Sequence, residues 1–377
     1  MSRLKSSDRF RFSAASMALA ALIFLIPALK NGNPSLYLLA VLVPCAMFFC
    51  GTVLARLFSL DRLLLSLVLW FCAAGIAAFA PSDPEAALTQ ALRCGAALIS
   101  LLIGGMMVRS LSPSLLTSAC TAFLGLLILA GKLISPSLDL PLIQGAVALL
   151  LIAYASLFAR QGPVSALFLS IVVLALLLLR GDTTEAVLWG LTMLLLAFAA
   201  DGRLVVILPA LAAVLLLFLV SFRLGTAPVF VQESSALSAF ISAGLTGTDM
   251  LPESLATAVD GSLFTLLTGH YGLLFSGLTV LLFLPFFLRG STVAGSARLR
   301  WHALLAMGIS LLFSFRTLIA VLLAFGILPL SGLSLPFLTA SLPDLCAQLC
   351  LVGLLCGISG RNDADLAEDA HLAMLAK

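Results

Sequence analysis

One arginine in this sequence occupies a position where a charge is costly. Arg316 lies inside the apolar run 311–325. A charged side chain in a membrane-spanning helix is rare, usually faces the interior of the helix bundle and commonly serves a function. A guanidinium group suits the recognition of phosphate or carboxylate groups. The alternatives are a structural ion pair with Asp182 or Asp344, or a side chain that reaches back to the membrane surface.

A second set of candidate residues lies in one long polar segment, residues 223–269. A carboxylate near a membrane surface is partly desolvated, which raises its pKa toward values suited to a general base. A long segment among short connections is where function is expected, although a disordered spacer could have the same length. The apolar residues Leu237, Phe240 and Leu245 argue against a spacer, because such residues favour packing. The polar candidates are Gln232, Glu233, Asp249, Glu253 and Asp260.

The surrounding sequence is that of a membrane protein. Of its 377 residues, 62% are hydrophobic and 10% are charged, whereas soluble domains carry about 25% charged residues. In lipid, every backbone polar group needs an internal partner, which leaves a helix bundle or a closed barrel. Barrel strands alternate apolar and polar residues, but the apolar runs here are unbroken for roughly 17–23 residues, the length of a spanning helix. We therefore expect an all-α, polytopic transmembrane helix bundle.

The apolar windows predict about twelve spans and their orientation. They are 13–30, 35–57, 61–80, 87–109, 113–135, 142–160, 164–180, 184–200, 203–222, 270–289, 302–328 and 341–358. A cytoplasmic N-terminus places most Lys and Arg residues of the short loops on the cytoplasmic side, as expected for bacterial inner-membrane proteins. Both termini are then cytoplasmic, and residues 223–269 form one long extracellular loop.

Several function classes are disfavoured by what the sequence lacks. The net charge of +3 is too small to suggest nucleic-acid binding. The eight cysteines all lie in apolar runs, where they are expected to pack as small apolar residues, and no metal site is expected. The chain has no phosphate-binding loop of the G-x-x-x-x-G-K-[ST] type, which argues against an ATP-driven machine.

One Pro/Gly-rich stretch carries a resemblance to a known family. Gly326-Ile-Leu-Pro329-Leu-Ser-Gly332-Leu-Ser-Leu-Pro336-Phe337-Leu-Thr339 resembles the G-L-L-P-x-T-G-x-x-L-P-F-x-S stretch of the SEDS family, the FtsW-, RodA- and SpoVE-like proteins. The prolines fix φ and the glycines allow tight bends, so this stretch is expected to form an extended re-entrant turn between two helices. An ordinary Pro/Gly loop between helices is the alternative.

Further matches follow in the family's order. Gln232-Glu-Ser-Ser235 through Gly244-Leu-Thr-Gly247 is similar to Q-x-x-x-S-L-x-A-x-x-S-G-G-L-x-G, and Gly269-His-Tyr-Gly272 parallels G-E-E-L-G. Asp182-Thr-Thr-Glu-Ala186 is similar to D-L-G-T-A, and Pro141-Leu-Ile-Gln144 has the layout of the family's Q-P-S-E helix.

The resemblance divides the chain into three parts. Residues 61–358 form the SEDS-like domain of about ten spans, including loop 223–269. Residues 1–60 add a basic segment and two helices, and residues 359–377 form a short cytoplasmic tail.

The resemblance implies a peptidoglycan glycosyltransferase that polymerises lipid II at the outer face of the membrane, in cell division, cell shape or sporulation. Asp260 is the expected catalytic base, because it precedes a spanning helix and matches the family's loop aspartate apart from a one-residue shift. Its rivals are Asp249 and Glu253, and an acid near a helix N-terminus is favourable without any catalytic role. The expected substrate-binding residues are Arg316, Gln232, Ser235, Glu253, Asp182 and Thr339.

The implied partners are lipid II, membrane lipid and a class B penicillin-binding protein with transpeptidase activity. A divalent cation such as Mg2+ on the pyrophosphate is chemically compatible. For Asp182, a structural role is the alternative, as a helix N-cap or as the partner of Arg180 or Arg316.

The chain also departs from the family pattern. The family's S-Y-G-G-S reads Thr339-Ala-Ser-Leu-Pro343, and its Gln and Asn on the preceding helix are replaced by Arg316 and Ala320. Two other functions therefore stay open. One is an O-antigen ligase or polymerase-like glycosyltransferase, which the nearly arginine-free loop disfavours. The other is a catalytically degenerate scaffold or lipid flippase.

Overall fold

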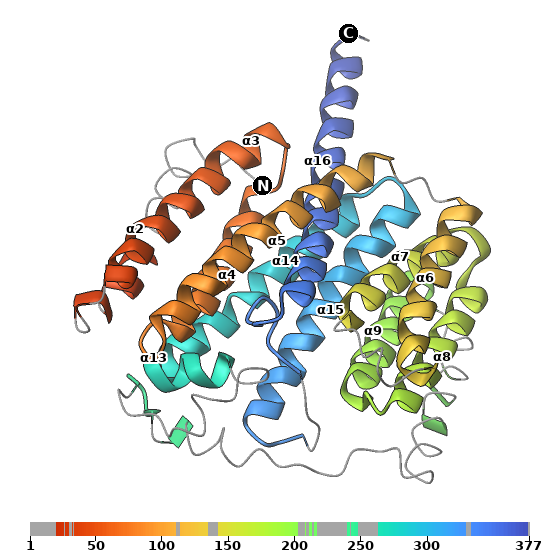
Figure 1. Cartoon of the computed structure of the whole chain (residues 1–377). Coiled ribbons are helices and arrows are strands. Elements are labelled where there is room, and N and C mark those ends of the chain that lie inside the picture. Colours follow the sequence, from red (N-terminus) through yellow and green to blue (C-terminus); the bar gives the residue numbers. More distant parts are fainter. Residues whose placement is uncertain are drawn as a thin grey trace.

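The structure is a computed structural model of the whole chain. It describes residues 20–25, 27–29, 32, 34–110, 114–134, 142–202, 208, 211–212, 215–216, 240–241, 243–247, 263–328 and 333–375. The elements within these residues are helices (Figure 1): α2 (Pro34–Phe49), the π-helical η1 (Cys50–Leu54), α3 (Ala55–Leu57), α4 (Arg62–Phe79), α5 (Pro84–Ser110), α6 (Leu115–Ile134), α7 (Ile143–Gln161), α8 (Pro163–Arg180), α9 (Thr183–Asp201), α13 (Leu263–Leu281), α14 (Phe283–Ser296), α15 (Arg300–Ala324) and α16 (Leu342–Leu375). The predicted all-α bundle is confirmed.

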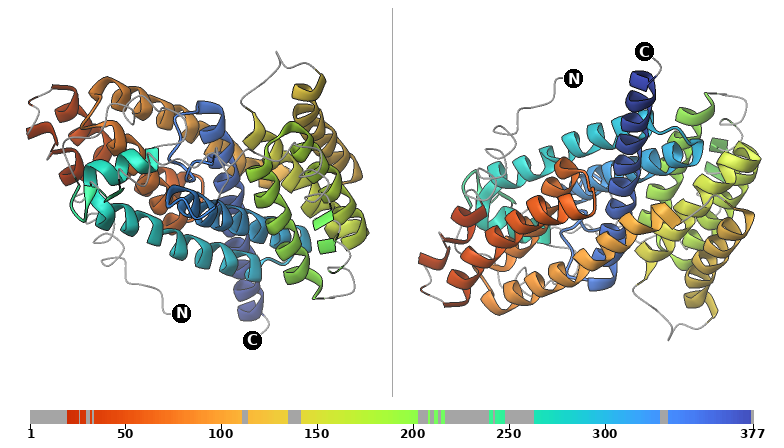
Figure 2. Two further views of the ribbon diagram at one scale, coloured as in Figure 1. Left: turned by 90° about the horizontal axis from the view of Figure 1, so that it is seen from below. Right: turned by 90° about the horizontal axis from the view of Figure 1, so that it is seen from above.

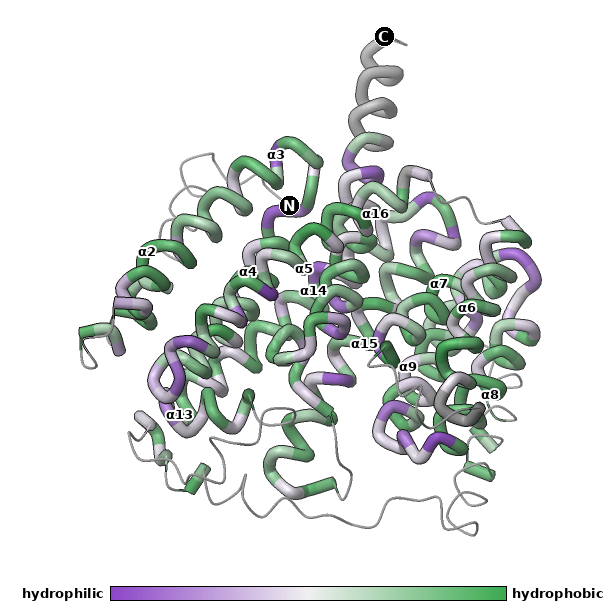
Figure 3. The backbone as a smooth tube through the Cα atoms, in the orientation of Figure 1, coloured by the Kyte–Doolittle hydropathy of each residue, from purple (hydrophilic) through white to green (hydrophobic). Residues whose placement is uncertain are grey.

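The helices have the length and composition of membrane spans. In the described part of the chain, nine are long and apolar enough to cross a membrane, and shorter apolar helices cover Ala20–Leu29 and Leu115–Gly131. Figure 3 shows hydrophobic residues along most of their length. The chain is thus a multi-pass membrane protein, and the predicted windows coincide with helices except 203–222, which lies mostly outside the described residues.

Two helices run further than the apolar windows predicted. Helix α13 begins at Leu263, inside the predicted loop 223–269, and a kink at Gly272, with φ of 80°, interrupts it. Helix α16 continues to Leu375 through the predicted tail and projects beyond the other helices (Figure 1). An apolar window marks the residues suited to contact with lipid, whereas a helix ends where capping or backbone geometry stops it. The ends of a window and of its helix can therefore differ.

Helices α5 and α16 pack in close contact along their length. A Cβ added to Gly353 would collide with the carbonyl of Leu101, and one added to Gly104 would collide with the carbonyl of Cys350. Small residues allow such close contact between membrane helices. Both views of Figure 2 place α2 on one side of the bundle and α6 and α8 on the other, with α16 between them.

The segment 333–341, between α15 and α16, enters the bundle, and we call it the re-entrant segment. Its Phe337 is fully buried and has a positive φ of 65°, which is rare for a residue other than glycine. The Phe337 ring lies 5.7 Å from that of Phe71 on α4 and 5.1 Å from that of Phe313 on α15. Aromatic packing therefore anchors the segment between helices, as predicted for this part of the re-entrant turn; residues 329–332 of the predicted turn lie outside the described residues.

Candidate functional site

Buried polar side chains gather at the two ends of the bundle. At one end, α5, α7, α9 and α16 begin and α15 finishes, and we call it the Arg316 end. At the opposite end, α4 begins and α14 finishes, and we call it the Asp61 end (Figure 1).

Arg316 on α15 points into the bundle and is paired with a carboxylate. Its Nη1 lies 3.2 Å from Oε1 of Glu185, in the first turn of α9, and its Nε donates a 3.3 Å hydrogen bond to the carbonyl of Ser334. The Arg316 and Glu185 side chains are 5% and 12% exposed. The inward orientation predicted for Arg316 is confirmed. The carboxylate that the structure pairs with Arg316 is Glu185, which was not among the acids predicted for this role; it lies in the first turn of α9, which packs beside α15.

Asp182 has a different partner. Its Oδ2 lies 2.6 Å from Nε of Arg180, and Nη1 of Arg180 donates a 3.2 Å bond to the carbonyl of Leu129 on α6. Asp182 precedes α9 but its side chain does not cap that helix. The structure therefore places Asp182 in the turn between α8 and α9, where its ion pair with Arg180 connects this turn to α6.

Two glutamines bond the re-entrant segment, and a third supports one of them. Gln348 on α16 accepts a 2.6 Å bond from the backbone N–H of Phe337 and donates a 3.2 Å bond to Oε1 of Gln144 on α7. Gln90 on α5 donates a 2.8 Å bond to the carbonyl of Thr339. Both Gln90 and Gln348 are buried. Side chains from α5 and α16 thus satisfy backbone groups of the segment, and Gln144 on α7 supports Gln348.

Thr339, an expected substrate-binding residue, lies at this same end. It is buried, and its Oγ1 accepts a 3.2 Å bond from the N–H of Ser341. Glu185, Gln90 and Gln348 were not singled out by the sequence analysis, although a lone acid or amide inside an apolar helix is a signal that could have found them.

Two of the glycine motifs contact each other. The N–H of Leu273 donates to the carbonyl of Gly244 at 3.1 Å, and the N–H of Leu274 donates to that of Leu245 at 3.3 Å. A Cβ on Gly247 would collide with the carbonyl of His270. The 243–247 part of the first motif therefore packs directly on the kink of α13, which positions the end of this motif against the bundle.

The remaining predicted site residues lie outside the described residues: Asp260, Gln232, Ser235 and Glu253. Within the ranges that the structure does describe, no three His, Cys, Asp or Glu side chains are grouped as metal ligands.

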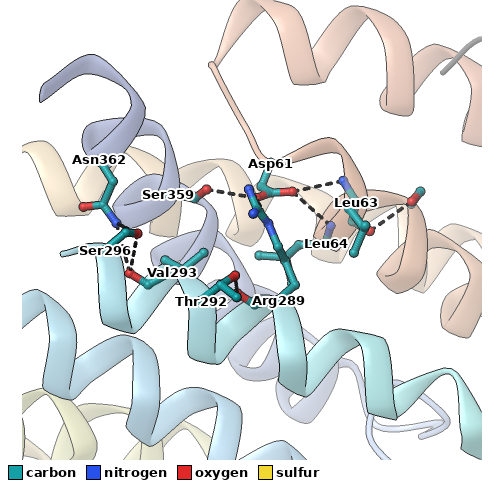
Figure 4. A network of polar contacts seen from close by, with 10 residues as sticks. Asp61, Leu63, Leu64, Arg289, Thr292, Val293, Ser296, Ser359 and Asn362 are labelled. Carbon is teal, nitrogen blue, oxygen red and sulfur yellow. Dashed lines mark hydrogen bonds and ion pairs between the residues drawn. The ribbon is translucent and has the colours of Figure 1, made fainter. Parts of the chain in front are cut away.

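The Asp61 end holds a second ion pair, between the buried Asp61 side chain and the partly exposed Arg289, and its bonding is denser (Figure 4). Oδ2 of Asp61 lies 2.6 Å from Nη2 and 2.7 Å from Nε of Arg289, and it accepts a 2.9 Å bond from Ser359. Oδ1 of Asp61 caps α4 by accepting bonds from the N–H groups of Leu63 and Leu64. One carboxylate thus joins α4, α14 and α16, as expected of a structural residue.

The Arg316 end has the chemistry of an anion-binding site. A guanidinium has five N–H donors, and the described contacts of Arg316 use Nη1 and Nε alone. The cation also lies near the N-terminus of α9, where the helix dipole favours negative charge. A phosphate oxygen could therefore be bound here by charge-assisted hydrogen bonds.

Comparisons with known proteins identify the fold. No protein-family model matches the chain, and no curated protein matches it. A solved peptidoglycan synthase complex, described in terms of the coordination of polymerization and crosslinking, contains a chain that superposes with a TM-score of 0.62 at 19% identity, covering 81% of this chain and 98% of that chain.

The rod shape determining protein RodA of Thermus thermophilus superposes with a TM-score of 0.56 at 18% identity, covering 80% of this chain and 97% of RodA. An aspartate-to-alanine variant of RodA gives the same TM-score at 17% identity. The chain therefore has the RodA fold, and the SEDS resemblance drawn from the motifs is confirmed at the level of fold.

Proposed function

We propose that this chain is a divergent SEDS protein that polymerises peptidoglycan glycan strands from lipid II at the outer face of the bacterial cytoplasmic membrane. Three findings support the proposal: the RodA fold, the motifs in family order, and a buried arginine beside the re-entrant segment. Arg316 is the observation that carries it, because a buried cation in the membrane needs an anionic partner. Both termini are cytoplasmic, so the Arg316 end faces outward.

The proposed reaction transfers a glycosyl group. A sugar hydroxyl of one lipid-linked saccharide attacks the anomeric carbon of another and forms a C–O bond. The bond between that carbon and the phosphate oxygen breaks, and the polyprenyl pyrophosphate leaves with the electron pair. The carboxylate of Asp260 takes the hydroxyl proton, and Arg316 stabilises the charge on the leaving group. Gln232, Ser235, Glu253 and Thr339 contribute hydrogen bonds to the substrate.

The proposed partner is a class B penicillin-binding protein that crosslinks the new strands. The similar chain in the peptidoglycan synthase complex supports this pairing, because that complex is described as combining polymerization with crosslinking. The process served is cell division, cell shape or sporulation.

The test uses the full-length protein in lipid nanodiscs with purified lipid II, with and without the transpeptidase. Wild type is expected to produce glycan strands. Asp260→Asn is expected to lower the rate at least ~100-fold, because general-base catalysis contributes about that much. Asp249→Asn is the matched control and is expected to keep most of the rate. Full activity of Asp260→Asn would contradict the assignment of Asp260 as the catalytic base. A wild-type protein that makes no strands even with the transpeptidase present would favour the alternative function as a scaffold or lipid flippase.

A further inference from the structure

The ion pair at the Arg316 end is buried but weakly bonded. Nη1 of Arg316 and Oε1 of Glu185 share one contact of 3.2 Å, which is long for a charge-assisted hydrogen bond. Burying either charge without its partner is costly, so Arg316 needs an anion in every state of the protein. The single long contact with Glu185 meets that need only weakly, so an anion that forms more or shorter hydrogen bonds with Arg316 can replace Glu185.

We propose that Glu185 is an exchangeable counter-ion, and that a pyrophosphate group displaces it from Arg316 when substrate binds. This inference rests on the proposed function and deepens it by assigning Glu185 as a residue that tunes substrate affinity. The ligand class is a pyrophosphate ester, and the shared chemistry extends to inorganic pyrophosphate.

The charges around Arg316 fit an exchange. The described ionic groups in the turn before α9 and in its first turn, together with Arg316, are Arg180, Asp182, Glu185 and Arg316, two cations and two anions. Asp182 is held by Arg180 at 2.6 Å, so of these two carboxylates Glu185 is the one that competes for Arg316. Displacing it leaves one guanidinium for the incoming phosphate.

The geometry of Arg316 allows the exchange without moving its anchor. Its Nε is bonded to the carbonyl of Ser334 in the re-entrant segment, whereas a different nitrogen, Nη1, meets the carboxylate. Two phosphate oxygens can each accept from this planar group, which is a stronger arrangement than one carboxylate contact. The α9 N-terminus, which carries no side-chain cap, adds its dipole to the attraction.

The competing explanation is a purely structural ion pair, and the two explanations predict opposite effects for one substitution. If Glu185 competes with the ligand, Glu185→Gln removes a rival anion and strengthens pyrophosphate binding. If the pair is structural, the same substitution leaves Arg316 buried without a counter-charge and weakens folding, with no gain in affinity.

The experiment measures the binding of inorganic pyrophosphate and of a polyprenyl pyrophosphate to the full-length protein in nanodiscs. Glu185→Gln is expected to lower both dissociation constants roughly tenfold, because it removes a repelling and competing carboxylate. Glu185→Asp, which keeps the charge but shortens its reach, is expected to lower them less. Arg316→Gln is expected to abolish saturable binding, and Arg289→Lys, the control at the Asp61 end, is expected to leave it unchanged.

Unchanged or weaker pyrophosphate binding by folded Glu185→Gln would overturn the inference. Such a result would leave the proposed function standing if wild type polymerises lipid II. Tighter pyrophosphate binding by Glu185→Gln, in a protein whose wild type makes no glycan strands, would support the exchange and contradict the proposed polymerase function. If Glu185→Gln binds only the polyprenyl pyrophosphate more tightly, the displacing ligand is the lipid-linked form. If it binds both ligands more tightly, the pyrophosphate group alone displaces Glu185.

Discussion

Asp61 and Arg289 at one end of the bundle share two contacts of 2.6 and 2.7 Å, whereas Glu185 and Arg316 at the other end share one of 3.2 Å. Asp61 also caps α4 and accepts a bond from Ser359. Its bonding capacity is therefore used by the fold. Arg316 is more deeply buried than Arg289, 5% against 39% exposed, yet its described contacts, of 3.2 and 3.3 Å, are longer than those of Arg289.

The difference shows how to separate a structural charge from a functional one in a membrane protein. A structural charge is surrounded by partners that satisfy it, because an unsatisfied buried group is costly. A charge that binds a ligand keeps donors in reserve and depends on the ligand to complete its bonding. The three experiments that follow, ordered by expected effect, each test one side of this contrast.

The largest expected effect is on activity. Arg316→Gln is expected to lower the rate of lipid II polymerisation about 100-fold, the usual scale for losing a charge-stabilising donor. Arg289→Gln is the matched substitution at the Asp61 end and is expected to keep the catalytic rate. Strand synthesis by the two purified variants checks the contrast, which fails if the two lose activity to the same degree.

The next effect is on stability. Asp61→Ala is expected to lower the free energy of unfolding by about 2 kcal/mol, roughly half from the lost helix cap and half from the bond to Ser359. The Arg289 contact adds little, because that side chain is partly exposed. Thermal unfolding in detergent measures the loss, with Asp83→Ala, a cap at the exposed start of α5, as control. An unfolding temperature equal to wild type would show that Asp61 is not structural.

The smallest effect concerns the support of the site. Gln348→Ala leaves the buried N–H of Phe337 without its partner and is expected to cost about 1.5 kcal/mol. Because the re-entrant segment also bonds Arg316 through Ser334, the KM for lipid II is expected to rise more than kcat falls. Gln348→Glu, which keeps the acceptor, should restore most of the KM. Equal losses in both parameters, without rescue, would mean that the segment does not position Arg316.

Sequence patterns predicted those features of the structure that depend on residues close together in the sequence. The pairing of Asp182 with Arg180 was among the predicted alternatives, and these residues are separated by two positions. The re-entrant turn followed from Pro336 and the nearby glycines, whose backbone preferences act locally. The glycine kink at Gly272 lies within a predicted motif, but its contact with Gly247 could not be read from either motif.

Distant pairs were not predictable in the same way. Glu185 and Arg316 are separated by 131 positions, and Gln90 and Thr339 by 249. The sequence marked Arg316 as a cation that needs an anion, but it offered several acids and no means of choosing among them. Sequence reasoning named Asp182 and Asp344 as alternative structural partners, whereas the packing of α9 on α15 brings Glu185 to Arg316.

The sequence by itself determined that this protein is a bundle of membrane helices with a re-entrant turn, because unbroken apolar runs cannot fold stably in water and prolines fix the backbone where they stand. The tertiary structure alone decided which charges meet. Helix packing sets the rotation and depth of each side chain, and those two quantities determine that Asp61 meets Arg289 and Ser359 at short distances while Arg316 meets Glu185 at 3.2 Å.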